Sequence, residues 1–178
     1  SKNNKKKFYI LDYGCGSMEV SKKLLKKKFI KKIIGTDIFH HKFKKNNIEY
    51  IQKNKLFTSK NKKFDLIISI DVLHHIGVER SHKILNKLSK YSKYILIKDH
   101  FEYGFFSRHL LRFVDFYANY AYGVKIPKKY FTKKTWQFTI SKTSLKEIYR
   151  EDNFQQHDGL FNFILNKKHH FISILEKK

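Results

Sequence analysis

Short apolar runs alternate with lysine-rich segments along the first hundred residues. Each apolar run has the length of a strand, and several end in an acid, which is typical of buried parallel strands. The segments between them place apolar residues at helical spacing among lysines. Strands are expected at 8–12, 33–37, 48–52, 64–71 and 94–98, and helices at 18–28 and 79–91. Strands and helices alternating at this spacing predict an α/β fold with a doubly wound, mostly parallel sheet.

The remaining segments are less regular. Residues 39–47 are polar and predict a short helix and turn. Ser144 and Glu147 form a capping-box pattern, which predicts a helix from residue 144 to about residue 151. Two further strands are expected at 154–163 and 169–175. They bring the sheet to seven strands and end the chain in an antiparallel hairpin.

Residues 101–136 form an insert that is longer than a simple connection. As a helix it carries two stripes on nearly opposite sides. One consists of Phe106, Leu110, Phe113, Tyr117 and Tyr120, and the other of Arg108, Arg112, Asp115 and Asn119. Three interpretations stay open: a lid over an active site, an ordinary amphipathic surface helix, and an interfacial helix over 105–122 that contacts a membrane to collect a lipid substrate.

A glycine turn follows the first strand, in the order Asp12, Tyr13, Gly14, Cys15, Gly16. The two glycines permit positive φ and leave room for a ligand against the backbone. About twenty residues later the second strand ends in Asp37, where a carboxylate can accept hydrogen bonds from both ribose hydroxyls of an adenosine. Glu19 stands where a dinucleotide site needs a third glycine. A carboxylate there disfavours a pyrophosphate and favours a sulfonium or an amino group.

These residues resemble the first motif of class I S-adenosylmethionine-dependent methyltransferases, apolar-apolar-Asp-x-Gly-x-Gly. Residues 64–75, with Phe64-Asp65 at the start and Asp71-Val72-Leu73-His74-His75 at the end, look like the fourth motif of that family and are the most specific match. The resemblance covers the chain from residue 8 onward. It implies a Rossmann-like methyltransferase fold in which the last strand lies beside the fifth.

The resemblance also implies roles for individual residues. The turn of Gly14, Cys15 and Gly16 would shape the methionine pocket, and Asp12 would order the amino group of the cofactor. Asp37 would hold the ribose. The other implied contacts are Ile38 on the adenine, Asn54 on the adenine amine, and Asp71 with Val72 near the methyl group.

Polar side chains follow the ends of several predicted strands, and the carboxyl edge of a parallel sheet is where ligands bind. They are Asp12, Asp37, Asp71, Asp99 and His100. A general base is expected among the histidines, because imidazole titrates nearest neutrality. His100 beside Asp99 is the first choice, and His75 and His74 are the alternatives. We expect no metal site, because the acids are scattered over strand ends and no pair has ligand spacing.

Composition limits the remaining possibilities. A chain of 178 residues predicts one domain, 1–178, with the insert inside it. One cysteine excludes an internal disulfide and, with no apolar run long enough for a membrane span or a signal peptide, favours a cytoplasmic protein. The net charge of +24 favours anionic partners. Only four of the 39 basic residues are Arg, however, so nucleic acid is not the favoured substrate.

The expected function is methyl transfer from S-adenosylmethionine to a small-molecule, sugar or lipid acceptor. The alternative is an RNA or other nucleic-acid methyltransferase, although no Asn/Asp-Pro-Pro-aromatic motif for a flipped base is present. A non-catalytic binding module of the same fold is disfavoured, because Gly14, Gly16 and Asp37 are all retained.

Overall fold

The computed structural model describes residues 7–38, 44–45, 47–58, 63–120, 123–154 and 167–178. The strands are β1 (Phe8–Tyr13), β2 (Ile30–Thr36), β3 (Lys44–Lys45), β4 (Ile48–Tyr50), β5 (Leu66–Ile70), β6 (Tyr94–His100), β7 (Leu145–Asp152) and β8 (His170–Lys177). The helices are α1 (Glu19–Leu24), α2 (Lys53–Thr58), α3 (Leu73–Ile76), α4 (Val78–Leu88), α5 (Phe105–Asn119) and α6 (Lys133–Ser141), with the 3-10 turn η2 (Lys167–His169) before β8.

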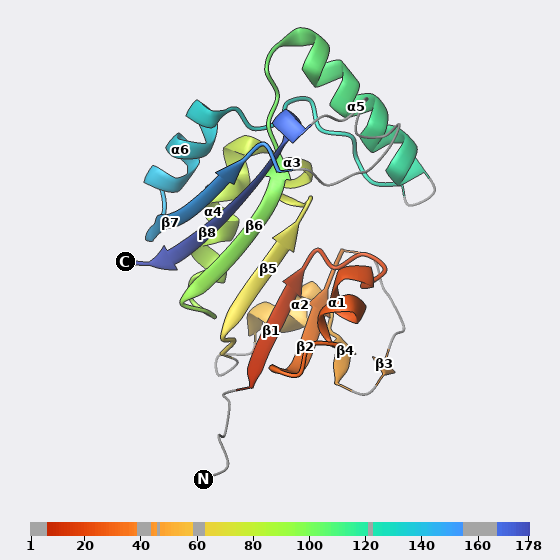
Figure 1. Cartoon of the computed structure of the whole chain (residues 1–178), viewed down its shortest axis with the longest axis vertical. Coiled ribbons are helices and arrows are strands. Elements are labelled where there is room, and N and C mark those ends of the chain that lie inside the picture. The colour runs from red at the N-terminus through yellow and green to blue at the C-terminus, as the bar shows by residue number, and fades with distance from the viewer. Residues whose placement is uncertain (1–6, 39–43, 46, 59–62, 121–122, 155–166) are drawn as a thin grey trace.

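The strands form one sheet in the order β3-β4-β2-β1-β5-β6-β8-β7 (Figure 1). Pairs from β4 to β6 are parallel, while β8 lies antiparallel between β6 and β7. This confirms the predicted α/β fold with C-terminal antiparallel strands. The two-residue strand β3 adds an eighth strand by pairing with β4, so the helix expected at 39–47 is wrong at Lys44–Lys45. Residues 39–43 and 46 lie outside the described part.

Consecutive residues of the central strands point to opposite faces of the sheet. Leu11, Ile34 and Ile67 belong to the large core beneath α2, α4 and α6, which also contains Leu56, Leu85 and Trp136. Their neighbours Ile10, Ile33 and Ile68 form a smaller core on the other face, against the C-terminal end of α1. The alternation follows from the two-residue period of a strand. It explains why these runs are continuously apolar, since both faces are covered.

The helix predicted from residue 144 is a strand instead. Leu145–Asp152 forms β7, which pairs with β8 along its whole length. The helix lies earlier, at Lys133–Ser141, beginning within the insert predicted at 101–136 and continuing past its end. There Thr132 and Thr135 form the reciprocal capping box, and Trp136 is fully buried. Ser144 does not cap a helix, because its backbone N–H donates to Asn86 Oδ1 at 2.9 Å. The strand expected at 154–163 falls almost wholly on residues outside the described part.

Helix α5 lies above the carboxyl edge of the parallel strands (Figure 1). Its inner side carries buried Leu111, which packs against Tyr130, and buried Asp115. Near its start, the Arg108 guanidinium donates two hydrogen bonds to the Glu102 carboxylate, at 2.8 and 2.6 Å. The apolar stripe is the exposed one, so the helix turns its polar stripe toward the sheet. Among the described residues, no helix has both the length and the apolar character needed to cross a bilayer.

Candidate active site

The glycine turn after β1 is held against the end of β2. Gly14 has a φ of +77°, and its N–H donates to the Thr36 carbonyl at 2.7 Å. A Cβ at this position would lie 2.4 Å from Val72 Cγ2, well inside contact distance. Gly16 also has a positive φ, of +46°, but open space around its Cα. Position 14 is therefore restricted to glycine by both backbone and packing, and position 16 by backbone alone.

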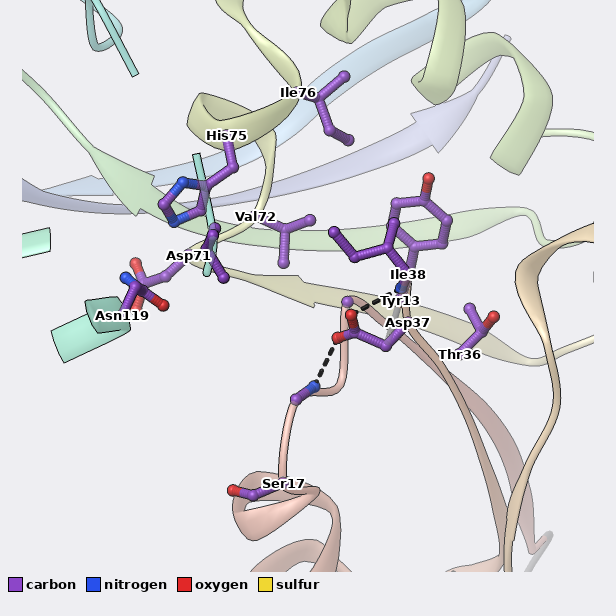
Figure 2. Close-up of a pocket in the computed structure, with 13 residues that line it drawn as sticks. Tyr13, Ser17, Thr36, Asp37, Ile38, Asp71, Val72, His75, Ile76 and Asn119 are labelled. Carbon is purple, nitrogen blue, oxygen red and sulfur yellow. Dashed lines mark hydrogen bonds between the residues drawn. The ribbon is translucent and has the colours of Figure 1, made fainter. Parts of the chain in front are cut away.

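Asp37 is fixed in place by two backbone N–H groups. Its Oδ2 accepts from Gly16 at 2.8 Å and its Oδ1 from Ile38 at 2.6 Å (Figure 2). The two bonds fix the orientation of the carboxylate, whose oxygens act as hydrogen-bond acceptors. The side chain thus links the glycine turn to the end of β2 and presents an oriented acceptor to the space between them.

A cavity of about 440 Å³ opens at this edge of the sheet. Figure 2 shows the side chains around it. The predicted cofactor residues Gly14, Gly16, Asp37, Ile38, Asp71 and Val72 all line it, as does His75. Sequence reasoning missed six lining residues, namely Tyr13, Ser17, Thr36, Ile76, Asn119 and Val124. Asn119 could have been predicted to face the cavity, because it lies on the polar stripe of the insert helix.

Two other predicted cofactor residues, Asp12 and Cys15, do not line the cavity. Asp12 is buried below the turn and accepts from Ser21 Oγ at 2.6 Å. Burial, supported by the nearby Asp37 charge, raises the pKa of Asp12 to about 6. Cys15 is a buried free thiol, and burial raises its pKa. Asn54 lies in α2, but its side chain is outside the described part, so its adenine contact remains a prediction.

Asp71 stands at the centre of the edge in a strained conformation. Its φ of +56° is in the left-handed region, which non-glycine residues rarely occupy. Lys98 Nζ donates to both carboxylate oxygens at 2.7 and 2.8 Å, and His100 Nε2 lies 3.1 Å from Oδ1. Burial alone would raise the pKa of Asp71, but the charges of His100 and Lys98 outweigh it and lower the pKa. Asp71 is therefore a carboxylate at neutral pH.

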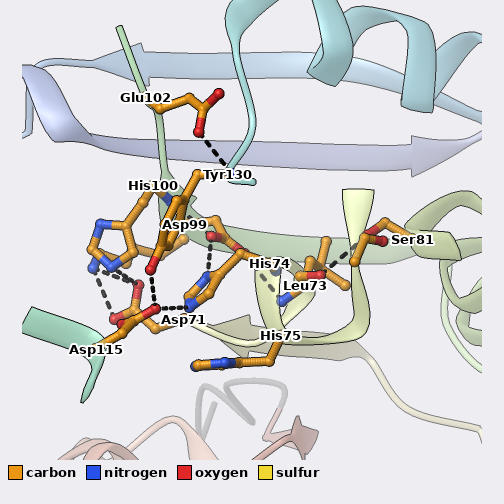
Figure 3. Close-up of polar contacts among 12 residues, drawn as sticks. Asp71, Leu73, His74, His75, Ser81, Asp99, His100, Glu102, Asp115 and Tyr130 are labelled. Atoms are coloured by element: carbon orange, nitrogen blue, oxygen red, sulfur yellow. Dashed lines mark hydrogen bonds and ion pairs between the residues drawn. The ribbon is translucent and has the colours of Figure 1, made fainter. Parts of the chain in front are cut away.

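His74 joins the sheet to α5 through two carboxylates (Figure 3). Its Nδ1 lies 2.6 Å from Asp99 Oδ1, and its Nε2 lies 3.3 Å from Asp115 Oδ2. The same Asp115 oxygen accepts from the Tyr130 hydroxyl at 2.5 Å. Burial would lower the pKa of His74, but the two acids outweigh it and raise the pKa to about 10. His74 is thus an imidazolium that bridges β6 and α5, which is a structural role.

A group of three potential metal ligands occurs in the described residues: His74, His75 and Asp115. The charge state of His74 argues against metal binding, because an imidazolium has no lone pair to donate. The expectation of no metal therefore remains a prediction, and none of the chemistry below requires a metal.

His75 is the histidine that borders the cavity. Its Nδ1 lies 3.2 Å from the Lys125 carbonyl. Because a carbonyl can only accept, Nδ1 must carry the proton, which leaves the lone pair on Nε2. Burial and the neighbouring His74 charge lower the pKa of His75, so the ring is neutral near pH 7. A neutral imidazole with an unprotonated nitrogen can accept a proton.

His100 and Asp99 lie elsewhere than expected. β6 continues to His100 rather than ending at residue 98. Its alternation therefore turns Asp99 toward His74 and His100 toward Asp71. Both side chains are buried, and neither lines the cavity. His100, the first choice of base from the sequence, therefore does not border the cavity, whereas the alternative His75 does.

Comparison with known proteins identifies the family. A family model described as a methyltransferase domain matches residues 1–158. The chain belongs to this methyltransferase family. Membership confirms the class of enzyme expected from the sequence, a methyltransferase. No curated protein matches the chain.

Solved structures of low sequence identity share the methyltransferase fold. One belongs to a Haloferax volcanii complex that contains the Trm112 methyltransferase activator, with a TM-score of 0.68, 9% identity, and coverage of 97% of this chain and 84% of that one. The structure of LepI in complex with SAM has a TM-score of 0.64 and 14% sequence identity, and the match covers 100% of this chain and 44% of LepI. Magnesium protoporphyrin IX methyltransferase from Synechocystis PCC 6803 with bound SAM has a TM-score of 0.58 and 12% sequence identity, and the match covers 98% of this chain and 72% of that one. The chain thus spans less than half the length of LepI.

Proposed function

We propose that this methyltransferase transfers the methyl group to a small-molecule, sugar or lipid acceptor that enters the cavity beside His75. In the proposed arrangement Asp37 binds the ribose, Ile38 lies on the adenine, and Gly14 and Gly16 leave room for the methionine part. The orientation of Asp37 by two backbone N–H groups is the observation that carries this proposal. A carboxylate held in this way has little freedom to lose when a ribose binds.

The acceptor is proposed to lie where α3 and the C-terminal end of α5 border the cavity. The residues that line the cavity there are His75, Ile76, Asn119 and Val124. This end offers two polar groups among apolar ones. Such a lining suits a compact acceptor with one hydroxyl or amine and an apolar body.

The chemical step needs a positioned nucleophile and, for a hydroxyl or ammonium acceptor, a base. Bound S-adenosylmethionine would supply an activated methyl group, and its transfer to the acceptor heteroatom would break the carbon–sulfur bond and leave the electron pair on sulfur. His75 Nε2 would accept the proton that the acceptor loses. In this arrangement Asp71 and Val72 would lie near the methyl group, with the Asp71 carboxylate held in place by Lys98 and His100.

One experiment separates cofactor binding from catalysis. S-adenosylmethionine affinity is measured by calorimetry for the wild type, Asp37→Ala and His75→Gln, with Glu151→Ala on the exposed edge strand as control. We expect Asp37→Ala to weaken binding by about tenfold or more, the value of about one charge-assisted hydrogen bond. His75→Gln should bind normally but lose turnover, and the wild-type rate should fall only in acid, because burial and the His74 charge lower the pKa of His75. Unchanged affinity in Asp37→Ala contradicts the proposed ribose contact.

Methyl transfer to a nucleic acid is the second candidate, and the net charge of +24 favours it. It predicts salt-dependent RNA binding and methylation of RNA but not of small acceptors. A screen of both acceptor classes with radiolabelled cofactor distinguishes the two candidates.

A further inference from the structure

The outward face of α5 is an unusual surface for a protein of this size. Six aromatic side chains on it, or directly after it, are half exposed or more: Phe105, Phe106, Phe113, Phe116, Tyr117 and Tyr120. Phe106 is 87% exposed and Tyr117 is 81% exposed. We call this set the aromatic face. Contiguous exposed apolar side chains of this kind mark a site of interaction with another surface.

The stretch of sequence that carries the aromatic face and follows it, residues 103–134, is strongly basic. Between residues 103 and 134 the sequence has a single acid, Asp115, and that acid is buried against Tyr130 and His74. The same stretch contains seven basic residues: Arg108, Arg112, Lys125, Lys128, Lys129, Lys133 and Lys134. Glu102 and Asp152 neutralise Arg108 and Lys133. Lys125, Lys128, Lys129 and Lys134 are exposed.

From this combination we propose that α5 docks the protein on an anionic lipid bilayer, with the aromatic face in the headgroup region and the lysines against the lipid phosphates. Exposed Phe and Tyr on one helix side suit the boundary between headgroups and acyl chains. Clustered lysines are attracted to anionic lipid surfaces. Nucleic acid fits the surface less well, because its phosphates are recognised largely through Arg forks, and Arg112 is the sole Arg here outside the Glu102 pair.

The inner side of the same helix connects this surface to the active site. Asn119, in the last turn of α5, lines the cavity, and Val124 lines it from the segment that follows. The docked helix would therefore hold the acceptor end of the cavity close to the bilayer. Resting on the function proposed above, this narrows the acceptor to an amphipathic molecule that resides in the membrane, such as a lipid with a hydroxyl or amine in its head.

Vesicle sedimentation with the full chain and no cofactor tests the docking alone. The probes are vesicles of phosphatidylcholine, with or without phosphatidylglycerol. The test variant is Phe106→Ser/Phe113→Ser/Tyr117→Ser, and the matched control is Phe29→Ser/Phe138→Ser/Tyr149→Ser, whose aromatic residues are also exposed. We expect the wild type and the control to bind the anionic vesicles, and the test variant to bind at least about tenfold more weakly. Binding should also weaken as salt rises toward about 1 M.

Several outcomes overturn the proposal. They are no binding of the wild type to anionic vesicles, equal loss in both triple variants, and a dimer or an RNA complex that only the test variant loses while vesicle binding is absent. S-adenosylmethionine affinity of the test variant, measured without vesicles, should equal that of the wild type. Because docking is measured without cofactor and cofactor binding without lipid, failure of one leaves the other intact.

Discussion

The contrast between Gly14 and Gly16 gives the sharpest stability prediction. Both residues have positive φ, so an alanine at either position carries a left-handed backbone cost of about 1–2 kcal/mol. At position 14 the new methyl would also lie 2.4 and 2.7 Å from the two γ-methyls of Val72. Val has a stiff χ1 and cannot turn both methyls away, so overpacking adds about 1–3 kcal/mol. Gly14→Ala should therefore lower the free energy of unfolding by about 2–5 kcal/mol in total.

Urea denaturation of Gly14→Ala, Gly16→Ala and the double variant Gly14→Ala/Val72→Ala measures this difference. Gly16→Ala should lose only about 1–2 kcal/mol, because no atom lies within 4 Å of its added methyl. In the double variant, removal of the Val72 methyls should recover part of the loss caused by Gly14→Ala alone. Equal losses at positions 14 and 16, or no recovery in the double variant, would refute the packing argument.

Two further predictions concern pH. The folded-state pKa of Asp12 is raised from 3.8 to about 6, so its ionisation costs about 3 kcal/mol of stability above pH 6 and nothing below pH 3.8. Asp12→Asn should therefore raise the urea midpoint at pH 7 but not at pH 3.5, and a lower midpoint at pH 7 would contradict this. For His74 the pKa is raised from 6.5 to about 10. The contribution of protonated His74 to the free energy of unfolding is fully present below pH 6.5 and is lost as pH rises toward about 10. The wild type should lose stability over that window in urea titrations, and Asp115→Asn should lose less; identical slopes would count against the bridge.

The parallel half of the sheet was predictable because each strand there is short, apolar on both faces, and followed by a distinct signal. Asp37, Gly14 and Gly16 are recognisable by residue type and by their place directly after a strand, although the contacts that they make come from distant residues. All three residues line the cavity at the carboxyl edge of the sheet.

The C-terminal third was harder because its structure is decided by distant partners. The capping pattern at Ser144 favours a helix, but pairing of β7 with β8 and burial of Leu145 outweigh that local preference. The error at His100 has a different cause. Consecutive side chains of a strand point to opposite faces, so Asp99 and His100 must point apart if both belong to β6. The sequence predicts the end of this strand at residue 98, and the rule could not be applied to them.

The bridge from Asp99 through His74 to Asp115 and Tyr130 bears on how molecules reach and leave the cavity. Swinging α5 outward as a unit would separate buried opposite charges, leaving each without its partner in a poorly hydrated place. The middle of α5 is thus held firmly against the sheet, and changes in cavity size are expected instead at its C-terminal end, where Asn119 and Val124 line the cavity. Residues there should control which acceptors are admitted, even though none of them belongs to the two sequence motifs of the family.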